Sequence, residues 1–148
     1  MMTREQATEA ILAARQKRGL TFEAIARAVG RHKVWVTSAL LGQATMSAEE
    51  ATKAVEALGL GEEVAQALQQ IPMRGSLDTD VPVDPLIYRF YELVQVYGTT
   101  WKALIHEMFG DGIMSAIDFD MDIQRKEDPK GDRVVITMSG KYLQYKTH

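Results

Sequence analysis

An arginine and a glutamate stand three residues apart in the aromatic segment YRFYE, residues 88–92. On a helix, positions i and i+3 share a face, so Arg89 and Glu92 would lie side by side. One carboxylate accepts only some of the five N–H groups of a guanidinium, and a small anion would accept the rest. The residues alone therefore leave two interpretations open: a structural ion pair, or a site where Arg89 binds an anion.

The helix expected to carry this pair is apolar over most of its circumference. Within residues 85–97, Leu, Phe, Leu and Tyr form one stripe, and Ile, Tyr and Val form the next. Such a helix is normally buried. The two helices and three short strands expected nearby are too few to cover it. We therefore expect an obligate oligomer in which copies of the chain pack against this helix.

A serine follows the glycine-containing turn of GDGIMSAI, residues 110–117. The segment is not a phosphate-binding loop, because it has two glycines and no Lys-Ser or Lys-Thr. It is also not a G-x-S-x-G nucleophile turn. A serine in this setting commonly bonds its own backbone. The alternative is that the Ser115 hydroxyl points at whatever Arg89 holds.

The remaining polar residues favour no metal site and no disulfide. The chain has no cysteine, and its three histidines, His32, His106 and His148, are widely separated. The aspartates of residues 118–122 alternate as on a solvated strand face and lack the glycine and final glutamate of a calcium loop. No apolar run is long enough for a membrane span. The N-terminus lacks the pattern of a signal peptide, so a cytoplasmic location is expected.

The first 70 residues predict a compact domain of five short helices. Capping residues and glycines place these helices at residues 4–18, 22–29, 32–41, 48–58 and 61–70. Residues 71–85 hold three of the four prolines, and residues 71–84 show no periodicity, so residues 71–84 predict an extended linker.

Residues 85–148 predict a small α+β domain. Asp84 and Pro85 begin a helix that Gly98 is expected to end, and a second helix follows to residue 109. Alternating apolar residues from 117 to 123, and the runs RVVITM and KYLQY, predict three strands. Ser139 and Gly140 would form the turn between the last two.

The segment LTFEAIARAVGRHKVWVTSALLG, residues 20–42, has the pattern of a helix-turn-helix and resembles the phage-repressor type of helical domain. Residues 34–41 supply few polar side chains for reading base edges. Through residue 70, eight Lys and Arg balance eight Asp and Glu. This neutral charge disfavours nucleic acid as a partner.

From about residue 71 onward the chain resembles the cyanase family, also called cyanate hydratase or cyanate lyase. The resemblance rests on PLIYRFYELVQVYGTTWKALIHEMFGDGIMSAIDF and ITMSGKYLQY, and the helical half with its LLGQ is similar to that family too. The resemblance implies that residues 85–148 form a catalytic and dimerisation domain that intertwines with a partner. It implies a decamer of five dimers, with a repressor-like N-terminal domain that does not act on DNA.

The resemblance also implies the chemistry. The family's catalytic arginine, glutamate and serine fall on Arg89, Glu92 and Ser115. The implied reaction is that of a lyase: cyanate and bicarbonate give carbamate and CO2, and carbamate then gives ammonia and CO2. Bicarbonate is a co-substrate, and no cofactor is expected. The alternative interpretation of the residues is an oligomeric helix-turn-helix regulator that binds DNA and senses a small anion.

Overall fold

The computed structural model describes residues 1–147 and divides the chain into two compact units. The first is Met1–Asp78, and the second begins at Thr79. His148, one of the three histidines considered above, lies outside the described residues. The division into residues 1–70, 71–84 and 85–148 stays a prediction, and no helix or strand forms between Leu68 and Pro85.

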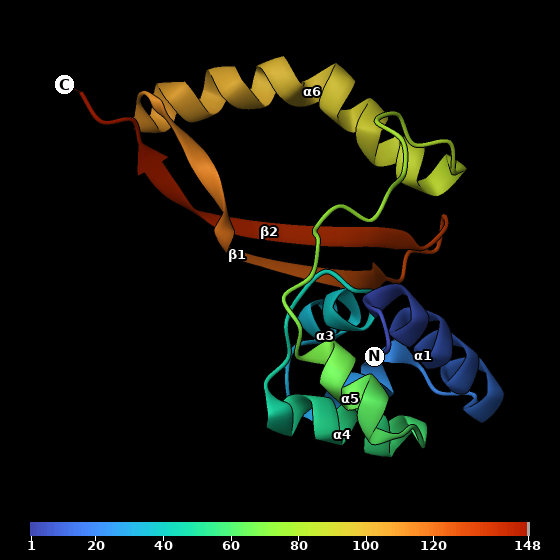
Figure 1. Cartoon of the computed structure of the whole chain (residues 1–148). Coiled ribbons are helices and arrows are strands. Elements are labelled where there is room, and N and C mark those ends of the chain that lie inside the picture. Colours follow the sequence, from blue (N-terminus) through green and yellow to red (C-terminus); the bar gives the residue numbers. More distant parts are fainter. Residues whose placement is uncertain (148) are drawn as a thin grey trace. The chain divides into compact units, whose positions relative to one another are not determined.

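The first unit consists of the five predicted helices (Figure 1). They are α1 (Arg4–Arg18), α2 (Phe22–Val29), α3 (Lys33–Leu40), α4 (Ala48–Leu58) and α5 (Glu62–Leu68). Two of the helices begin with a capping box. In this motif the N-cap hydroxyl accepts a hydrogen bond from the N3 amide, and the N3 side chain accepts one from the N-cap amide. Thr3 with Gln6 forms the box of α1, and Ser47 with Glu50 forms that of α4. Local sequence signals therefore determine where these helices begin.

The core of the first unit is made of small and aliphatic side chains. Ile11, Ile25, Val36 and Leu40 are fully buried there. The Arg4 guanidinium ties the helix ends together, because it donates to the carbonyl oxygens of four residues, Ala39, Ala44, Ala67 and Gln70. These carbonyls end or follow α3 and α5, where the helix dipole favours positive charge.

An ion pair links the turn after α2 to the start of α4. Arg31 donates to the Glu50 carboxylate at 3.0 Å, and its guanidinium carbon lies 3.6 Å from the centroid of the Trp35 ring. Burial raises the pKa of the Glu50 carboxyl, but hydrogen bonds from Ser47 and Arg31 outweigh burial. The pKa of Glu50 therefore lies below its usual value.

The second unit begins with a single long helix, α6 (Pro85–Phe109). Asp84 caps it by accepting from the amides of Leu86 and Ile87, as its position before a proline predicts. The prediction that Gly98 ends the helix was wrong. One glycine inside a helix costs only about 1 kcal/mol, and Gly98 lacks the positive φ of the glycines that end α1, α2 and α4.

Two long antiparallel strands follow, β1 (Gly112–Lys126) and β2 (Arg133–Gln144). The prediction of a third strand after a turn at Ser139 and Gly140 was wrong, since β2 runs straight through these residues. The reason is steric. A Cβ on Gly140 would lie 2.4 Å from the carbonyl oxygen of Ser115, so the glycine permits a close approach of the strands.

The close approach occurs at a large bulge in β1. Met114 pairs with Tyr142 and Phe119 pairs with Gly140, so residues 115–118 of β1 stand opposite Lys141 alone. Ser115 lies at the start of this bulge and is only 5% exposed. Its hydroxyl oxygen accepts from the amides of Ile117 at 3.0 Å and Asp118 at 2.9 Å. The serine thus satisfies backbone groups that the interrupted ladder leaves unpaired.

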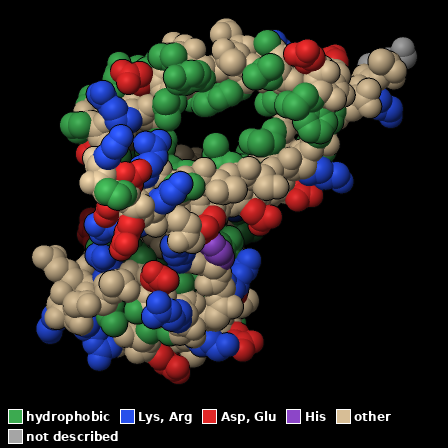
Figure 2. All heavy atoms as spheres, turned by 180° about the vertical axis from the view of Figure 1, so that it is seen from behind, with side chains coloured by type: hydrophobic (Ala, Val, Ile, Leu, Met, Phe, Trp, Pro, Cys, Tyr) green, Lys and Arg blue, Asp and Glu red, His purple; other side chains and the backbone are tan. Residues whose placement is uncertain are grey.

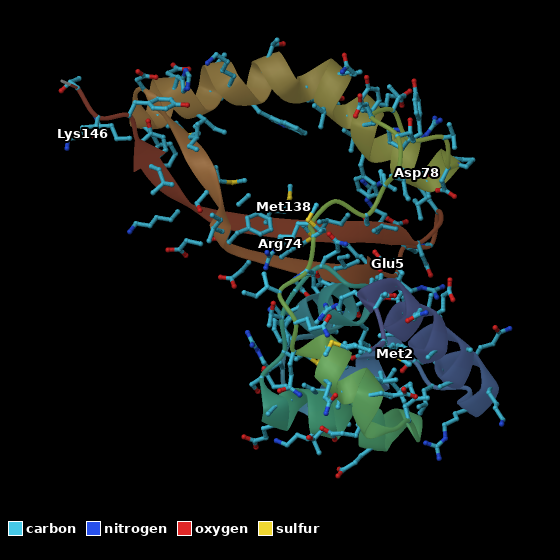
Figure 3. All side chains as sticks on the ribbon, in the orientation of Figure 1. Met2, Glu5, Arg74, Asp78, Met138 and Lys146 are labelled. Carbon is cyan, nitrogen blue, oxygen red and sulfur yellow. The ribbon has the colours of Figure 1, made fainter. Side chains whose placement is uncertain are left out.

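Within the second unit, α6 contributes no buried residue. Its exposed large apolar side chains range from 39% exposed for Ile87 to 69% for Met108. Figure 2 shows an opening between α6 and the hairpin that is rimmed by hydrophobic side chains. Met138, which is 54% exposed, lies on β2 beside this opening (Figure 3). The chain by itself does not supply the cover that an apolar helix requires.

We expect the Glu50→Gln substitution to lower the Tm by about 2–4 °C at pH 7 and hardly at all at pH 3. Glutamine can still accept from the Ser47 amide, but it loses the charge that attracts Arg31. Because the pKa of Glu50 is lower in the folded state than in the unfolded state, its charge stabilises the fold at pH values above the unfolded-state pKa. This contribution disappears as the pH falls through the folded-state pKa.

Circular dichroism during thermal unfolding measures this effect. The matched control is Glu49→Gln, because the Glu49 side chain is 79% exposed and pairs only along its own helix, with Lys53. An equal loss of Tm at both pH values in Glu50→Gln would contradict the assignment to its charge.

The Ser115→Ala substitution should destabilise the second unit, because it leaves the amides of Ile117 and Asp118 without their acceptor. Ile117 and Asp118 are themselves exposed, so water can replace part of this bonding, and each lost hydrogen bond costs about 0.5–1.5 kcal/mol. Urea unfolding of the full chain gives the difference directly. Ser139→Ala is the matched control, since Ser139 is exposed on β2. Equal unfolding midpoints for the two variants would show that these bonds do not stabilise the bulge.

Candidate active site

Arg89 and Glu92 lie on the same face of α6, within its first turns. One guanidinium nitrogen of Arg89 is 3.8 Å from a Glu92 carboxylate oxygen. Arg89 Nε donates to the carbonyl oxygen of Pro85 at 3.2 Å, and the guanidinium carbon is 5.3 Å from the Tyr88 ring centroid. In the chain by itself this is a loose and exposed ion pair, with side chains 60% and 49% exposed. A pair of this kind contributes at most about 1 kcal/mol.

The geometry leaves most of the Arg89 guanidinium available for a ligand. Nε–H is the group that hydrogen-bonds within the described residues 1–147, and the contact with Glu92 is longer than a hydrogen bond. The two terminal nitrogens present their N–H groups in a planar fork. A fork of this shape matches the oxygens of a carboxylate or a similar small anion.

Ser115 is buried, and its hydroxyl is fixed by the bulge. Both lone pairs of its oxygen are occupied by backbone amides, so the proton remains as the group that can interact with a ligand. The expectation that such a serine bonds its own backbone is confirmed. This bonding also makes the hydroxyl a positioned donor, since two accepted bonds orient it.

One chain does not bring Arg89 and Ser115 together. Arg89 lies in the second turn of α6, and the helix rises ~30 Å between Arg89 and Phe109. The six residues from Phe109 to Ser115 recover at most ~20 Å of that distance even when fully extended. The described residues of one copy alone therefore do not form a site that contains both side chains, whose hydrogen bonds and ion pair are with other groups.

The turn that carries Ser115 is held by residues that the sequence pattern did not single out. The Tyr142 hydroxyl donates to the Gly110 carbonyl oxygen at 2.6 Å, and its ring stacks on Phe109 with centroids 4.9 Å apart. His106 Nε2 lies 3.2 Å from the carbonyl oxygen of Gly112. The run KYLQY reveals a strand but not its register, and only the register places Tyr142 beside this turn.

The structure offers little support for other sites. Within residues 1–147, no three acidic or histidine side chains gather as a metal would require. A hollow of about 690 Å³ in the first unit is lined by Arg4, whose guanidinium is already bonded to backbone carbonyls. No helix in the described part of the chain has the length and hydropathy of a bilayer span.

The helix-turn-helix residues are also occupied. Arg31 pairs with Glu50 and stacks on Trp35, and the ring nitrogen Nδ1 of His32 accepts from the amide that begins α3. Arg31 and His32, which directly precede α3, therefore bond within their own domain. This arrangement gives no support to DNA binding.

Family models match both halves of the chain. The model described as "Cyanate hydratase, N-terminal" matches residues 4–72, and that described as "Cyanate lyase C-terminal domain" matches residues 79–147. These two ranges cover nearly the whole sequence.

Similar proteins agree with the family models over their full lengths. The cyanate hydratase of Dechloromonas aromatica (strain RCB) is 58% identical over 99% of this chain and 100% of its own length. That of Cupriavidus necator is 56% identical with the same coverage. A crystal structure of cyanase from T. urticae has a TM-score of 0.82 at 40% identity, and covers 93% of this chain and 96% of its own. The chain thus belongs to the cyanate hydratase family of lyases, in agreement with the resemblance of its sequence.

Proposed function

We propose that this protein is a cyanate hydratase that decomposes cyanate with bicarbonate as co-substrate. Membership of the family across both halves of the chain carries this proposal. Cyanate, bicarbonate and one proton give carbamate and CO2. Carbamate then takes up a second proton and releases ammonia and CO2. Two protons are consumed for each cyanate, so the reaction makes an unbuffered solution more alkaline.

The main physical difficulty of this reaction is that two anions must meet. At ~4 Å and an effective dielectric constant of about 20, their repulsion is roughly 4 kcal/mol. We assign Arg89 to offset this repulsion, because its forked N–H groups are open to a ligand. The same groups would stabilise the charge of the adduct. Glu92, 3.8 Å from the guanidinium, would orient Arg89, and we also propose it as a proton relay.

We assign Ser115 to donate a hydrogen bond to a substrate oxygen or nitrogen. It is not assigned as a nucleophile, since both lone pairs of its hydroxyl oxygen accept backbone amides. Fixing the two substrates between Arg89 and Ser115 would supply much of the acceleration, up to ~7–11 kcal/mol for ideal alignment. This assignment uses no metal or organic cofactor, and we expect the protein to act in the cytoplasm.

The site would form between copies of the chain. The exposed apolar residues of α6 and the opening beside the hairpin support an obligate oligomer (Figure 2). Packing of copies would bury α6 and bring Arg89 of one copy close to Ser115 of another. It would also remove water from Arg89, which strengthens its attraction to anions. We propose intertwined dimers assembled into a decamer of five.

Release of ammonia from cyanate, measured with and without added bicarbonate, tests the proposed function. Ammonia that appears only when bicarbonate is present supports it. No release under either condition would refute it. Salt-dependent binding of the same preparation to duplex DNA, together with no turnover, would instead support the regulator that senses a small anion.

We expect Arg89→Lys to lower kcat/KM for cyanate by at least about a hundredfold while the assembly stays intact. Lysine keeps the charge but loses the planar fork. Steady-state ammonia release and size-exclusion chromatography measure the two properties. Lys102→Arg is the control, because it makes the reverse exchange, lysine to arginine, at another position of α6. Near-normal turnover by Arg89→Lys would exclude the forked-arginine role.

The Leu93→Asp substitution should dissociate the oligomer and abolish turnover together. Leu93 is 41% exposed in the single chain, and a carboxylate in a buried interface costs several kcal/mol. Light scattering gives the mass in solution, and the ammonia assay gives the activity. Lys102→Asp places the same carboxylate at an exposed polar position of α6 as a control. An unchanged mass for Leu93→Asp would show that this face of α6 is not an interface.

A further inference from the structure

We propose that Tyr142 is a positioning residue for Ser115, and that its hydroxyl holds the turn from which β1 starts. The inference rests on the proposed function, because it concerns how the Ser115 donor is placed for turnover. Tyr142 does not contact Arg89 or Glu92 in the chain, and its role would be indirect.

The position of the Ser115 hydroxyl is determined by backbone rather than by side-chain packing. Its oxygen is bonded to amides two and three residues further along the same strand. These bonds fix the hydroxyl within the bulge, but they move with the bulge. The direction in which the proton points therefore depends on how residues 110–114 are anchored.

Tyr142 is placed to provide that anchor. It pairs with Met114, the last paired residue before the bulge. Its hydroxyl reaches past the strand to donate to the Gly110 carbonyl oxygen at 2.6 Å, and its ring stacks on Phe109 at the end of α6. One side chain thus links the end of the helix, the turn and the start of β1, which lie beside the end of β2 in Figure 1.

The residues around Tyr142 are compatible with this role. Gly110 has φ 94° and ψ −161°, a conformation that only glycine adopts readily. Because glycine also has many other accessible conformations, an outside contact such as the Tyr142 hydrogen bond helps to hold this one. A Cβ on Gly112 would lie 2.4 Å from the Tyr142 hydroxyl, so glycine gives the phenol its room. Loss of water around the phenol and the nearby charge of Asp111 raise the pKa of Tyr142. The hydroxyl therefore keeps its proton and continues to donate at neutral and moderately alkaline pH.

Tyr142→Phe tests the proposal, because it removes the hydroxyl and keeps the ring that stacks on Phe109. We expect kcat for cyanate to fall about three- to tenfold, the range for one lost neutral hydrogen bond, with KM for both anions unchanged. Tyr145→Phe is the matched control. The Tyr145 side chain is 61% exposed, and the contact of this residue with the turn is made by its backbone amide.

A double-mutant cycle distinguishes positioning of Ser115 from a general structural effect. In the Ser115→Ala background, Tyr142→Phe should lower kcat no further, since no hydroxyl remains to be positioned. Equal losses in both backgrounds would overturn the proposal, as would wild-type kcat in Tyr142→Phe alone. Loss of the oligomer or of secondary structure in Tyr142→Phe would also overturn it. If the wild-type protein released no ammonia from cyanate, the proposed function itself would fail.

Discussion

A long, uncovered helix is the constraint on which the second half of this protein depends. α6 runs through 25 residues without interruption and buries none of them within its own unit. Its apolar surface must be covered for the fold to be stable in water, because a chain of this size gains most of its stability from burial. The same length keeps Arg89 away from Ser115. In the function that we propose, stability and chemistry would both depend on the packing of other copies against α6.

The helical unit could be predicted almost completely from the sequence. Its helices start at residues such as Thr3 and Ser47, whose side chains satisfy the first amides, and most end at glycines. These are local effects, and they are visible within a few residues. The third helix was expected at residues 32–41 and spans Lys33–Leu40, and the fifth was expected at residues 61–70 and spans Glu62–Leu68. These ends carry weaker local signals than Thr3 and Ser47 do.

The errors arose where glycines were interpreted as the end of a helix or strand. Gly98 lies inside α6, and Gly140 lies inside β2. Gly140 is needed because the bulge at Ser115 approaches it, which is a contact between segments far apart in the sequence. A pattern of apolar and polar residues carries no information about such an approach. The same limit explains why Tyr142 was not identified near the turn.

The candidate site was predictable in its residue types but not in its arrangement. The spacing of Arg89 and Glu92 placed them correctly on one face of a helix. Bonding of Ser115 to its own backbone is confirmed, and it leaves the hydroxyl proton as a directed donor. The interpretation in which this hydroxyl points at whatever Arg89 holds stays a prediction. The apolar residues of the helix predict an oligomer. The spacing of residues along one chain does not reveal which side chains of different copies would come into contact.

The distance that α6 imposes between Arg89 and Ser115 has a genetic consequence. Suppose that each active site takes its arginine from one chain and its serine from another. In an oligomer of mixed chains, a mutation of either residue then inactivates only some of the active sites. Two alleles, one defective at Arg89 and the other at Ser115, would restore some intact centres when expressed in the same cell. Such complementation is impossible for an enzyme whose working groups all come from one polypeptide.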